Sequence, residues 1–276
     1  MIVQAAERGE FLALMQETYG SAMSAAEFDW WFDRNPAGPR VLNAARDDDG
    51  TALGALSMHF ARMDNGTNAF AVHAVTTPAA RGRGVFSTLE LHNEQEAAAA
   101  GSRWALGFTN PMAGPILVGR LGWEDVTSLR IWVRPKRLRR RREGRVEPTQ
   151  IELAARDLPA HHLVRDGEYL HWRYAESPRL YAQAGGVVVT HALWHGLSSA
   201  VVCEHGRGLN AALRHVEADI AVAMVNPGEE RRFLAAGFVP TPRSIRFIGK
   251  RLTDDAPELP KRRDAWHFTL GDLDFF

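Results

Sequence analysis

The residues whose types and spacing best suit chemistry lie at 77–87, where the sequence reads Thr-Pro-Ala-Ala-Arg-Gly-Arg-Gly-Val-Phe-Ser. An apolar run at 69–76 predicts a buried strand before this segment, and residues 85–100 predict a helix after it. Glycines in such a loop expose backbone N–H groups at the positive end of the helix. Arg81 and Arg83 add full positive charges. We therefore expect the loop to bind an anion such as a pyrophosphate.

The order Val-x-Thr-Pro-x-x-Arg-Gly-x-Gly resembles the acyl-CoA loop of the GNAT N-acetyltransferase superfamily. The family pattern is Arg/Gln-x-x-Gly-x-Gly/Ala after the fourth strand; Arg81 and Gly84 match it, and Phe86 stands where the second Gly or Ala is usual. The resemblance implies acetyl-CoA as cosubstrate, and the alternative is a glycine-rich turn without a nucleotide. The cofactor-binding residues that it implies are Val75, Thr76, Arg81, Gly82, Arg83, Gly84, Val85, Phe86 and Ser87.

Transfer of an acyl group from a thioester to an amine needs a neutral amine and a stabilised oxyanion. Deprotonating an alkyl amine of pKa near ~10 at pH 7 costs about 4 kcal/mol, and a positioned base recovers part of this cost. A fixed backbone N–H is a good oxyanion donor. The resemblance places that donor on the fourth strand, at Val75 or Thr76, and implies that the pantetheine arm pairs with the edge of this strand.

His73, on the same predicted strand, is the first candidate for the base because the unperturbed pKa of histidine suits a proton shuttle near neutral pH. A hydrogen-bonded core histidine is the alternative. Asn110 is a second catalytic candidate, able to orient substrate or water, unless it only starts a helix. The resemblance places the family's acidic tyrosine at Val118, which cannot donate a proton. With valine at this position, three possibilities follow: another residue is the acid, solvent protonates the leaving thiolate, or the protein does not catalyse the transfer.

Other polar and aromatic residues have simpler explanations. Phe28, Trp31 and Phe32 are spaced as a core stripe of a helix, which leaves Trp30, together with Trp172, as candidates for substrate contact. The histidines show no metal-ligand spacing, so we expect no metal, and the single cysteine, Cys203, is expected to be buried. The following acidic and histidine side chains are expected on a solvated helix face or in a surface tail: Glu90, His92, Glu94, Asp272, Asp274 and the terminal carboxylate of Phe276.

The elements that must position these residues occur twice along the chain. Residues 106–131 and 222–247 each read strand, Asn-Pro, helix, Gly-aromatic, strand, with Asn110 recurring as Asn226. Phe28-x-x-Trp31 is echoed, less closely, by Tyr169-x-x-Trp172. The second copy lacks the strand, loop and helix that carry the cofactor pattern, and keeps only the segment 205–209, which we interpret as a degenerate loop. We therefore expect a tandem GNAT-like chain.

The expected domains are an N-terminal cofactor-binding domain at 1–134, an arginine-rich linker at 135–148 and a degenerate C-terminal domain at 149–276. The fold class is α+β with a mixed sheet. In the first domain we expect helices at 5–19, 25–32, 85–100 and 111–121, and strands at 41–46, 52–63, 69–76, 104–108 and 123–133. Asp64-Asn65-Gly66 predicts a hairpin turn.

The formal net charge is zero, with 45% hydrophobic and 24% charged residues in a chain of 276. No apolar stretch approaches the ~20 residues of a membrane span, and the N-terminus lacks the pattern of a signal peptide. We therefore expect a cytoplasmic protein that does not associate with membranes. The basic run at 136–142 is expected to be a solvated linker, although it leaves nucleic-acid association as a weaker alternative.

The leading hypothesis is an N-acyltransferase that moves an acetyl group from acetyl-CoA to a primary amine of a small molecule or peptide. The absence of the usual tyrosine leaves a non-catalytic acyl-CoA-binding or scaffold protein as the rival. The sequence identifies neither the acceptor, nor the acyl chain length, nor the oligomeric state.

Overall fold

A computed structural model describes residues 1–20, 23–135, 158 and 161–273. Contacts divide the chain into two compact units, of which unit 1 contains Met1–Val126 and Phe247–Pro260, and unit 2 contains Thr127–Arg246 and Lys261–Phe276. Two long strands, β6 (Glu124–Pro135) and β12 (Val239–Arg251), begin in one unit and end in the other. No helix in the described part of the chain is long and apolar enough to cross a membrane.

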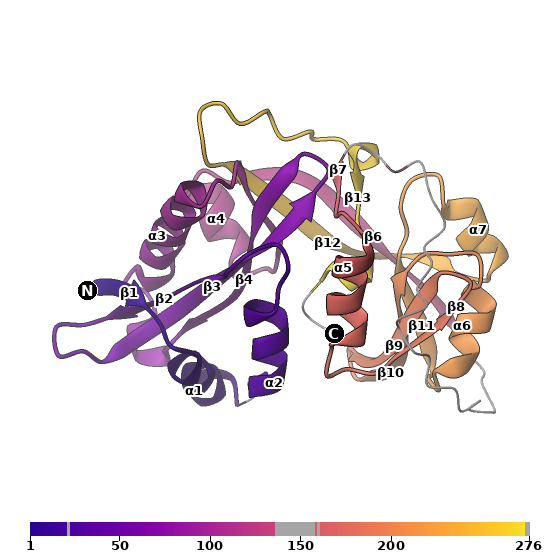
Figure 1. Cartoon of the computed structure of the whole chain (residues 1–276), viewed down its shortest axis with the longest axis horizontal. Coiled ribbons are helices and arrows are strands. Elements are labelled where there is room, and N and C mark those ends of the chain that lie inside the picture. Colours follow the sequence, from indigo (N-terminus) through magenta and orange to yellow (C-terminus); the bar gives the residue numbers. More distant parts are fainter. Residues whose placement is uncertain (21–22, 136–157, 159–160, 274–276) are drawn as a thin grey trace. The chain divides into compact units, whose positions relative to one another are not determined.

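Unit 1 is built on five strands and the end of β12. The five are paired in chain order: β1 (Ile2–Ala5), β2 (Val41–Arg46), β3 (Ala52–Met63), β4 (Gly66–Thr76) and β5 (Trp104–Thr109). Pairing is antiparallel from β1 to β4 and parallel between β4 and β5. The helices are α1 (Arg8–Tyr19), α2 (Ala25–Phe28), α3 (Val85–Ala99) and α4 (Gly114–Arg120). Figure 1 shows α3 and α1 on opposite faces of these strands.

The core of unit 1 forms because α3 turns an apolar side toward β2 and β3. Val85, Leu89 and Ala97 of the helix pack with Leu56 and Met58 of β3, all of them buried. Burying an aliphatic side chain of this size contributes about 1.5–3 kcal/mol. The expected turn at 64–66 joins β3 to β4, and Gly66 takes a φ of +114° that other residues avoid.

Unit 2 contains the parallel pair β10 (Leu197–Glu204) and β11 (Ile220–Met224). β10 pairs antiparallel with β9 (Val187–Trp194), which pairs with β8 (Tyr181–Ala184), and β11 pairs antiparallel with β6. Two short strands, β7 (His161–His162) and β13 (Trp266–His267), form a separate parallel pair. The helices are α5 (Gly167–Leu170), α6 (Leu209–Ala212) and α7 (Glu230–Ala235).

The α+β class with a mixed sheet is confirmed, and β2 and β3 begin and end where the sequence predicts. The predicted helix at 5–19 is wrong at its start, because Ile2–Ala5 forms β1 and α1 begins at Arg8. Contacts also divide the chain differently from the predicted domains, because Phe247–Pro260 packs within unit 1. Except for Pro135, the end of β6, the expected linker lies outside the described residues.

The two aromatic motifs have the same local structure. A π-helical turn follows α2 at Asp29–Asp33, and another follows α5 at His171–Ala175. Each short helix also starts with a side-chain cap, from Ser24 in unit 1 and from Asp166 in unit 2. This shared sequence of cap, turn of α-helix and π turn supports the interpretation of an internal repeat.

Candidate functional site

The strand β4 carries a bulge close to its C-terminal end. Val72 pairs with Ser57 and Ala74 pairs with Leu56, so His73 is the extra residue. His73 has a φ of +43°, a conformation that costs a non-glycine residue about 1 kcal/mol or more. A bulge bends its strand, and the pairing of β4 with β5 ends at Phe70 and Leu106. Beyond the bulge, β4 therefore has one edge that does not pair with β5.

The direction of the backbone groups on this edge follows from one hydrogen bond. The N–H of Thr77 donates to Leu53 O at 3.0 Å, toward β3. Since successive N–H groups of a strand point to opposite edges, the N–H of Val75 faces β3 and that of Thr76 faces away from it. The hydroxyl of Tyr19 donates to Ala74 O at 3.0 Å on this second edge. Of the two expected oxyanion donors, only Thr76 has a suitable orientation.

The loop after β4 leaves backbone donors open. Gly82 and Gly84 have φ values of +80° and +79°, and open space surrounds the position of a Cβ atom at each. The N–H groups of Arg81 and Arg83 close short turns on Pro78 O and Ala80 O. Within the described residues, the following N–H groups have no hydrogen-bond partner: Gly82, Gly84, Val85 and Phe86. Open N–H groups at the N-terminus of a helix favour the binding of an anion, and binding at this loop stays a prediction.

The side chains of the predicted cofactor residues divide into two groups. Arg81 and Arg83 are exposed beside the open N–H groups, so both are available to a phosphate. Val85 is buried in the core, Phe86 packs against it and Ser87 is half-buried. The phenylalanine at the position of the usual second glycine or alanine therefore packs on the hydrophobic core.

The carboxylates of α3 are not on a solvated face, which corrects the expectation for Glu90 and Glu94. Glu94 is buried and accepts hydrogen bonds from Trp123 Nε1 at 2.7 Å and Lys250 Nζ at 2.5 Å. Glu90 is 1% exposed, and neither of its oxygens has a hydrogen-bond partner among the described residues. Burial and the neighbouring charge of Glu94 raise the pKa of Glu90 to about 8, against the opposing effect of Lys250.

The remaining candidates for catalysis differ in their surroundings. Asn110 Oδ1 accepts hydrogen bonds from the N–H groups of Met112 and Ala113, both at 2.9 Å, so this side chain organises the turn before α4. Val118 lies on α4 and packs beside Leu117. Tyr19, which sequence reasoning placed only at a helix end, is the single tyrosine in residues 1–134. That count is the signal that could have singled it out.

The expectation that Trp30 points away from the core stripe of its helix is wrong, because its side chain is 1% exposed. The π turn causes this: Arg34 N donates to Asp29 O at 2.9 Å, and the wider turn directs Trp30 inward together with Trp31. Trp172 lies on the equivalent turn of unit 2 and is 5% exposed. Their contact with a substrate stays a prediction.

The loop after β10 in unit 2 repeats the Gly-Arg-Gly order with a different backbone environment. The N–H groups of Arg207 and Gly208 both donate to Gly185 O, at 2.8 Å and 3.2 Å. A Cβ atom at Gly206 or Gly208 would collide with the backbone of residues 184–186. The glycines here allow two backbone segments to approach closely, as expected for a degenerate loop. The N–H groups of Arg207 and Gly208 are already hydrogen-bonded.

The C-terminal segment of unit 2 is held by buried charges. Arg165 donates to Glu204 at 2.9 Å and to Asp272 at 2.7 Å, and all three side chains are nearly or fully buried. Asp272 is therefore not part of a surface tail, which corrects that expectation; Asp274 and Phe276 lie outside the described residues. Cys203 is buried as expected, and burial raises the pKa of its thiol to about 12, which excludes a ready nucleophile.

Several solved structures are similar to this chain, including the following three. The GCN5-related N-acetyltransferase from Kribbella flavida has a TM-score of 0.56 at 14% identity, covering 91% of this chain and 72% of that one. Eis1 from Mycobacterium abscessus has a TM-score of 0.59 at 14% identity, with coverages of 93% and 75%. The GCN5-related N-acetyltransferase from Anabaena variabilis has a TM-score of 0.59 at 11% identity, with coverages of 91% and 73%.

No protein-family model and no curated protein matches the sequence. At these identities the structural matches carry the argument for the fold, and the resemblance noted in the loop after β4 agrees with them. The chain has the fold of the GCN5-related N-acetyltransferases.

Proposed function

We propose that unit 1 transfers an acetyl group from acetyl-CoA to a primary amine of a small molecule or peptide. The observation that carries this proposal is the row of N–H groups at the start of α3 that have no partner among the described residues, beside Arg81 and Arg83. A pyrophosphate supplies the anionic oxygens that such donors bind. Directly before the loop, the unpaired edge of β4 offers backbone groups to the amides of a pantetheine arm.

The same edge supplies a donor for the tetrahedral intermediate. When the amine attacks the thioester carbon, the carbonyl oxygen becomes an oxyanion. The N–H of Thr76 faces away from β3 and is held in place by the neighbouring Thr77–Leu53 hydrogen bond. A donor fixed in this way needs little reorganisation during the reaction, and removing such a donor typically slows an enzyme about 10²–10³-fold.

Tyr19 is the general acid in this proposal, because Val118, at the position of the family's tyrosine, cannot donate a proton. Its hydroxyl is 3.0 Å from Ala74 O, on the edge of β4 that also carries the N–H of Thr76. In this position it can give its proton to the thiolate of CoA as the carbon–sulfur bond breaks. His73 takes the proton released by the amine and passes it to solvent, from which the phenolate recovers a proton.

His73 remains the base in this proposal, and its place at the bulge supports it. The bulge brings a residue with a strained backbone between Val72 and Ala74, next to the edge where the thioester would lie. Strain of this kind persists only where the surrounding structure holds it, and it is common at functional sites. Because Asn110 Oδ1 already accepts two backbone hydrogen bonds, we give Asn110 a structural part.

Calorimetric titration with acetyl-CoA tests the binding half of the proposal. Wild type is expected to bind one equivalent, and the variant R81A/G84E is expected to lose binding because a carboxylate then occupies the phosphate position. R207A is the matched control, since its loop has its N–H groups occupied. Binding that survives R81A/G84E would overturn the assignment of the loop.

Release of CoA thiol over a panel of amines tests the transfer half. Tyr19→Phe and His73→Gln are each expected to lower the rate about 10²-fold or more while leaving acetyl-CoA affinity unchanged, because acid–base groups act in the transition state. Binding without acceptor-dependent release would instead support a non-catalytic acyl-CoA-binding protein.

A further inference from the structure

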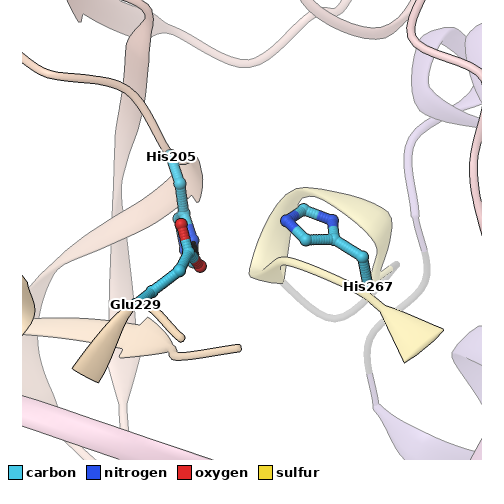
Figure 2. A group of neighbouring side chains, drawn as sticks. All are labelled: His205, Glu229 and His267. Atoms are coloured by element: carbon cyan, nitrogen blue, oxygen red, sulfur yellow. Dashed lines mark hydrogen bonds and ion pairs between the residues drawn. The ribbon is translucent and has the colours of Figure 1, made fainter. Parts of the chain in front are cut away.

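Three side chains of unit 2 that no part of the proposed reaction uses converge on one point. They are His205, Glu229 and His267, and one ligand atom of each lies within 4.8 Å of the other two (Figure 2). His205 and His267 are buried, at 0% and 4% exposure, and Glu229 is half-buried. From these residues we propose that unit 2 binds a zinc ion.

The fold explains how residues so far apart in sequence meet. β10 and β11 are parallel neighbours, so their carboxyl ends open at the same edge of the sheet. His205 follows β10 directly, and the turn after β11 leads to Glu229 just before α7. His267 is the last residue of β13. Each ligand therefore comes from a different segment, and two of the three lie next to a strand end.

Asn226 links two of these segments. Its Nδ2 donates to Glu229 Oε2 at 3.2 Å, and its Oδ1 accepts from Phe268 N at 3.2 Å and from Arg263 at 2.7 Å. The residue next to His267 is thus held by the same amide that orients Glu229. Groups that orient metal ligands in this way are a regular part of metal sites.

The donor set suits zinc. Two imidazole nitrogens and one carboxylate oxygen are ligands that Zn²⁺ accepts, with a fourth position left for water. Zinc bonds of about 2.1 Å place tetrahedral ligands about 3.4 Å apart, so changes of up to about 1.4 Å in the distances between the three ligand atoms give that geometry. The partial exposure of Glu229 gives the ion a way in.

One polar atom at this point, Nε2 of His205, has no hydrogen-bond partner among the described residues. His205 Nδ1 lies 2.6 Å from Glu229 Oε2, whereas its Nε2 is buried without a hydrogen-bond partner among the described residues. Arg232 donates to the other oxygen, Oε1, at 3.0 Å, so both carboxylate oxygens have partners and a metal would replace the His205 contact at Oε2. A buried nitrogen without a partner costs free energy that coordination can recover.

Cobalt titration of the purified full-length chain, stripped of metal by chelation, tests the proposal. Wild type is expected to bind one Co²⁺ with the intense visible absorption of a tetrahedral site, and one equivalent of Zn²⁺ is expected to displace it and raise the melting temperature by several degrees. No stoichiometric absorption, or absorption typical of six-coordinate cobalt in water, overturns the proposal.

Variants and a direct measurement of the ligands complete the test. H267Q and E229Q are each expected to weaken binding more than about 100-fold, because changes outside the ligand set alone cost roughly 10–100-fold. H191Q, at an exposed histidine of β9, is the matched control and should bind as wild type does. Unchanged binding in H267Q and E229Q contradicts the proposal. If both variants fail to fold, X-ray absorption of the zinc-loaded wild type decides: two imidazoles around zinc support the site, and any other set overturns it.

Discussion

The loop after β4 in unit 1 and the loop after β10 in unit 2 share a Gly-Arg-Gly order but use it in opposite ways. In the first, Gly82 and Gly84 adopt positive φ in open space, and several N–H groups have no partner in the part of the chain that the structure describes. In the second, Gly206 and Gly208 let the loop press against residues 184–186, whose Gly185 carbonyl accepts two of its N–H groups. One glycine pattern therefore leaves backbone donors open in one unit, where we propose an anion site, and allows close packing in the other.

The same contrast holds for buried ionisable groups. Glu90 of unit 1 is buried, and neither of its oxygens has a hydrogen-bond partner among the described residues, which is a costly state that functional sites often retain. In unit 2 the charge of Arg165 is matched by Glu204 and Asp272. A region that keeps its polar groups unpaired is prepared to bind something, whereas a region that pairs them gains order within its own fold. The difference between the two units can be tested with variants of the buried ionisable groups and with variants of the loop glycines.

The largest expected effect comes from removing the positive charge from the buried cluster of Arg165, Glu204 and Asp272 in unit 2. Arg165→Met leaves Glu204 and Asp272 buried without a counter-charge, which is expected to cost about 3–5 kcal/mol of the free energy of unfolding. Arg46→Met, which breaks a partly exposed ion pair with Glu10 in unit 1, should cost at most about 1 kcal/mol. Urea unfolding curves of the two variants measure both. Equal losses would mean that the cluster of unit 2 contributes no more than a surface pair.

The next effect separates the two kinds of glycine. Gly208→Ala places a Cβ atom against the backbone of Ala184 and should destabilise the chain by about 3 kcal/mol, because the neighbour is backbone and cannot move away cheaply. Gly82→Ala meets no atom and loses only the ease of positive φ, about 1 kcal/mol. Thermal unfolding provides the comparison. A larger loss in Gly82→Ala would contradict the assignment of an open loop to unit 1.

The third effect concerns the pH dependence of stability that Glu90 imposes. Because the folded protein holds the pKa of Glu90 at about 8, above its ordinary value of 4.5, the folded state keeps a proton that the unfolded chain releases. The contribution of protonated Glu90 to the free energy of unfolding is full below about pH 4.5. It is lost as the pH rises toward 8, by up to about 1.4 kcal/mol per pH unit. Glu90→Gln removes this slope, so the variant should gain stability relative to wild type from pH 5 to pH 8. Denaturant titrations at pH 5, 6.5 and 8 measure it, and parallel curves for the two proteins would refute the assignment.

The sequence predicts much of unit 1 because local signals and tertiary packing agree there. The largely apolar segment 52–63 and the turn residues at 64–66 indicate β3 and its hairpin, and the glycines at 82 and 84 indicate the loop. The bulge at His73 and the π turn that buries Trp30 depend on pairing and packing, which a linear pattern does not show. The meeting of His205 with His267 is equally hidden, since 61 residues separate them and no metal-ligand spacing connects them. The strand topology brings the two histidines together, so the periodicity of the sequence could not predict that they meet.

The smallest expected effect brings the comparison back to the two loops. Arg81→Ala should weaken acetyl-CoA binding about tenfold, which corresponds to the lower end, about 1.5 kcal/mol, of the range for a charge-assisted contact, because Arg81 is exposed and the N–H groups of the loop remain. Arg207→Ala should leave the affinity unchanged, because the neighbouring N–H groups are bonded to Gly185. Calorimetry at two salt concentrations measures both, and the difference between the variants should shrink at high salt, as expected when an exposed charge meets a phosphate. A tenfold loss in Arg207→Ala with none in Arg81→Ala would assign the cosubstrate to the loop of unit 2 and reverse the roles given to the two units.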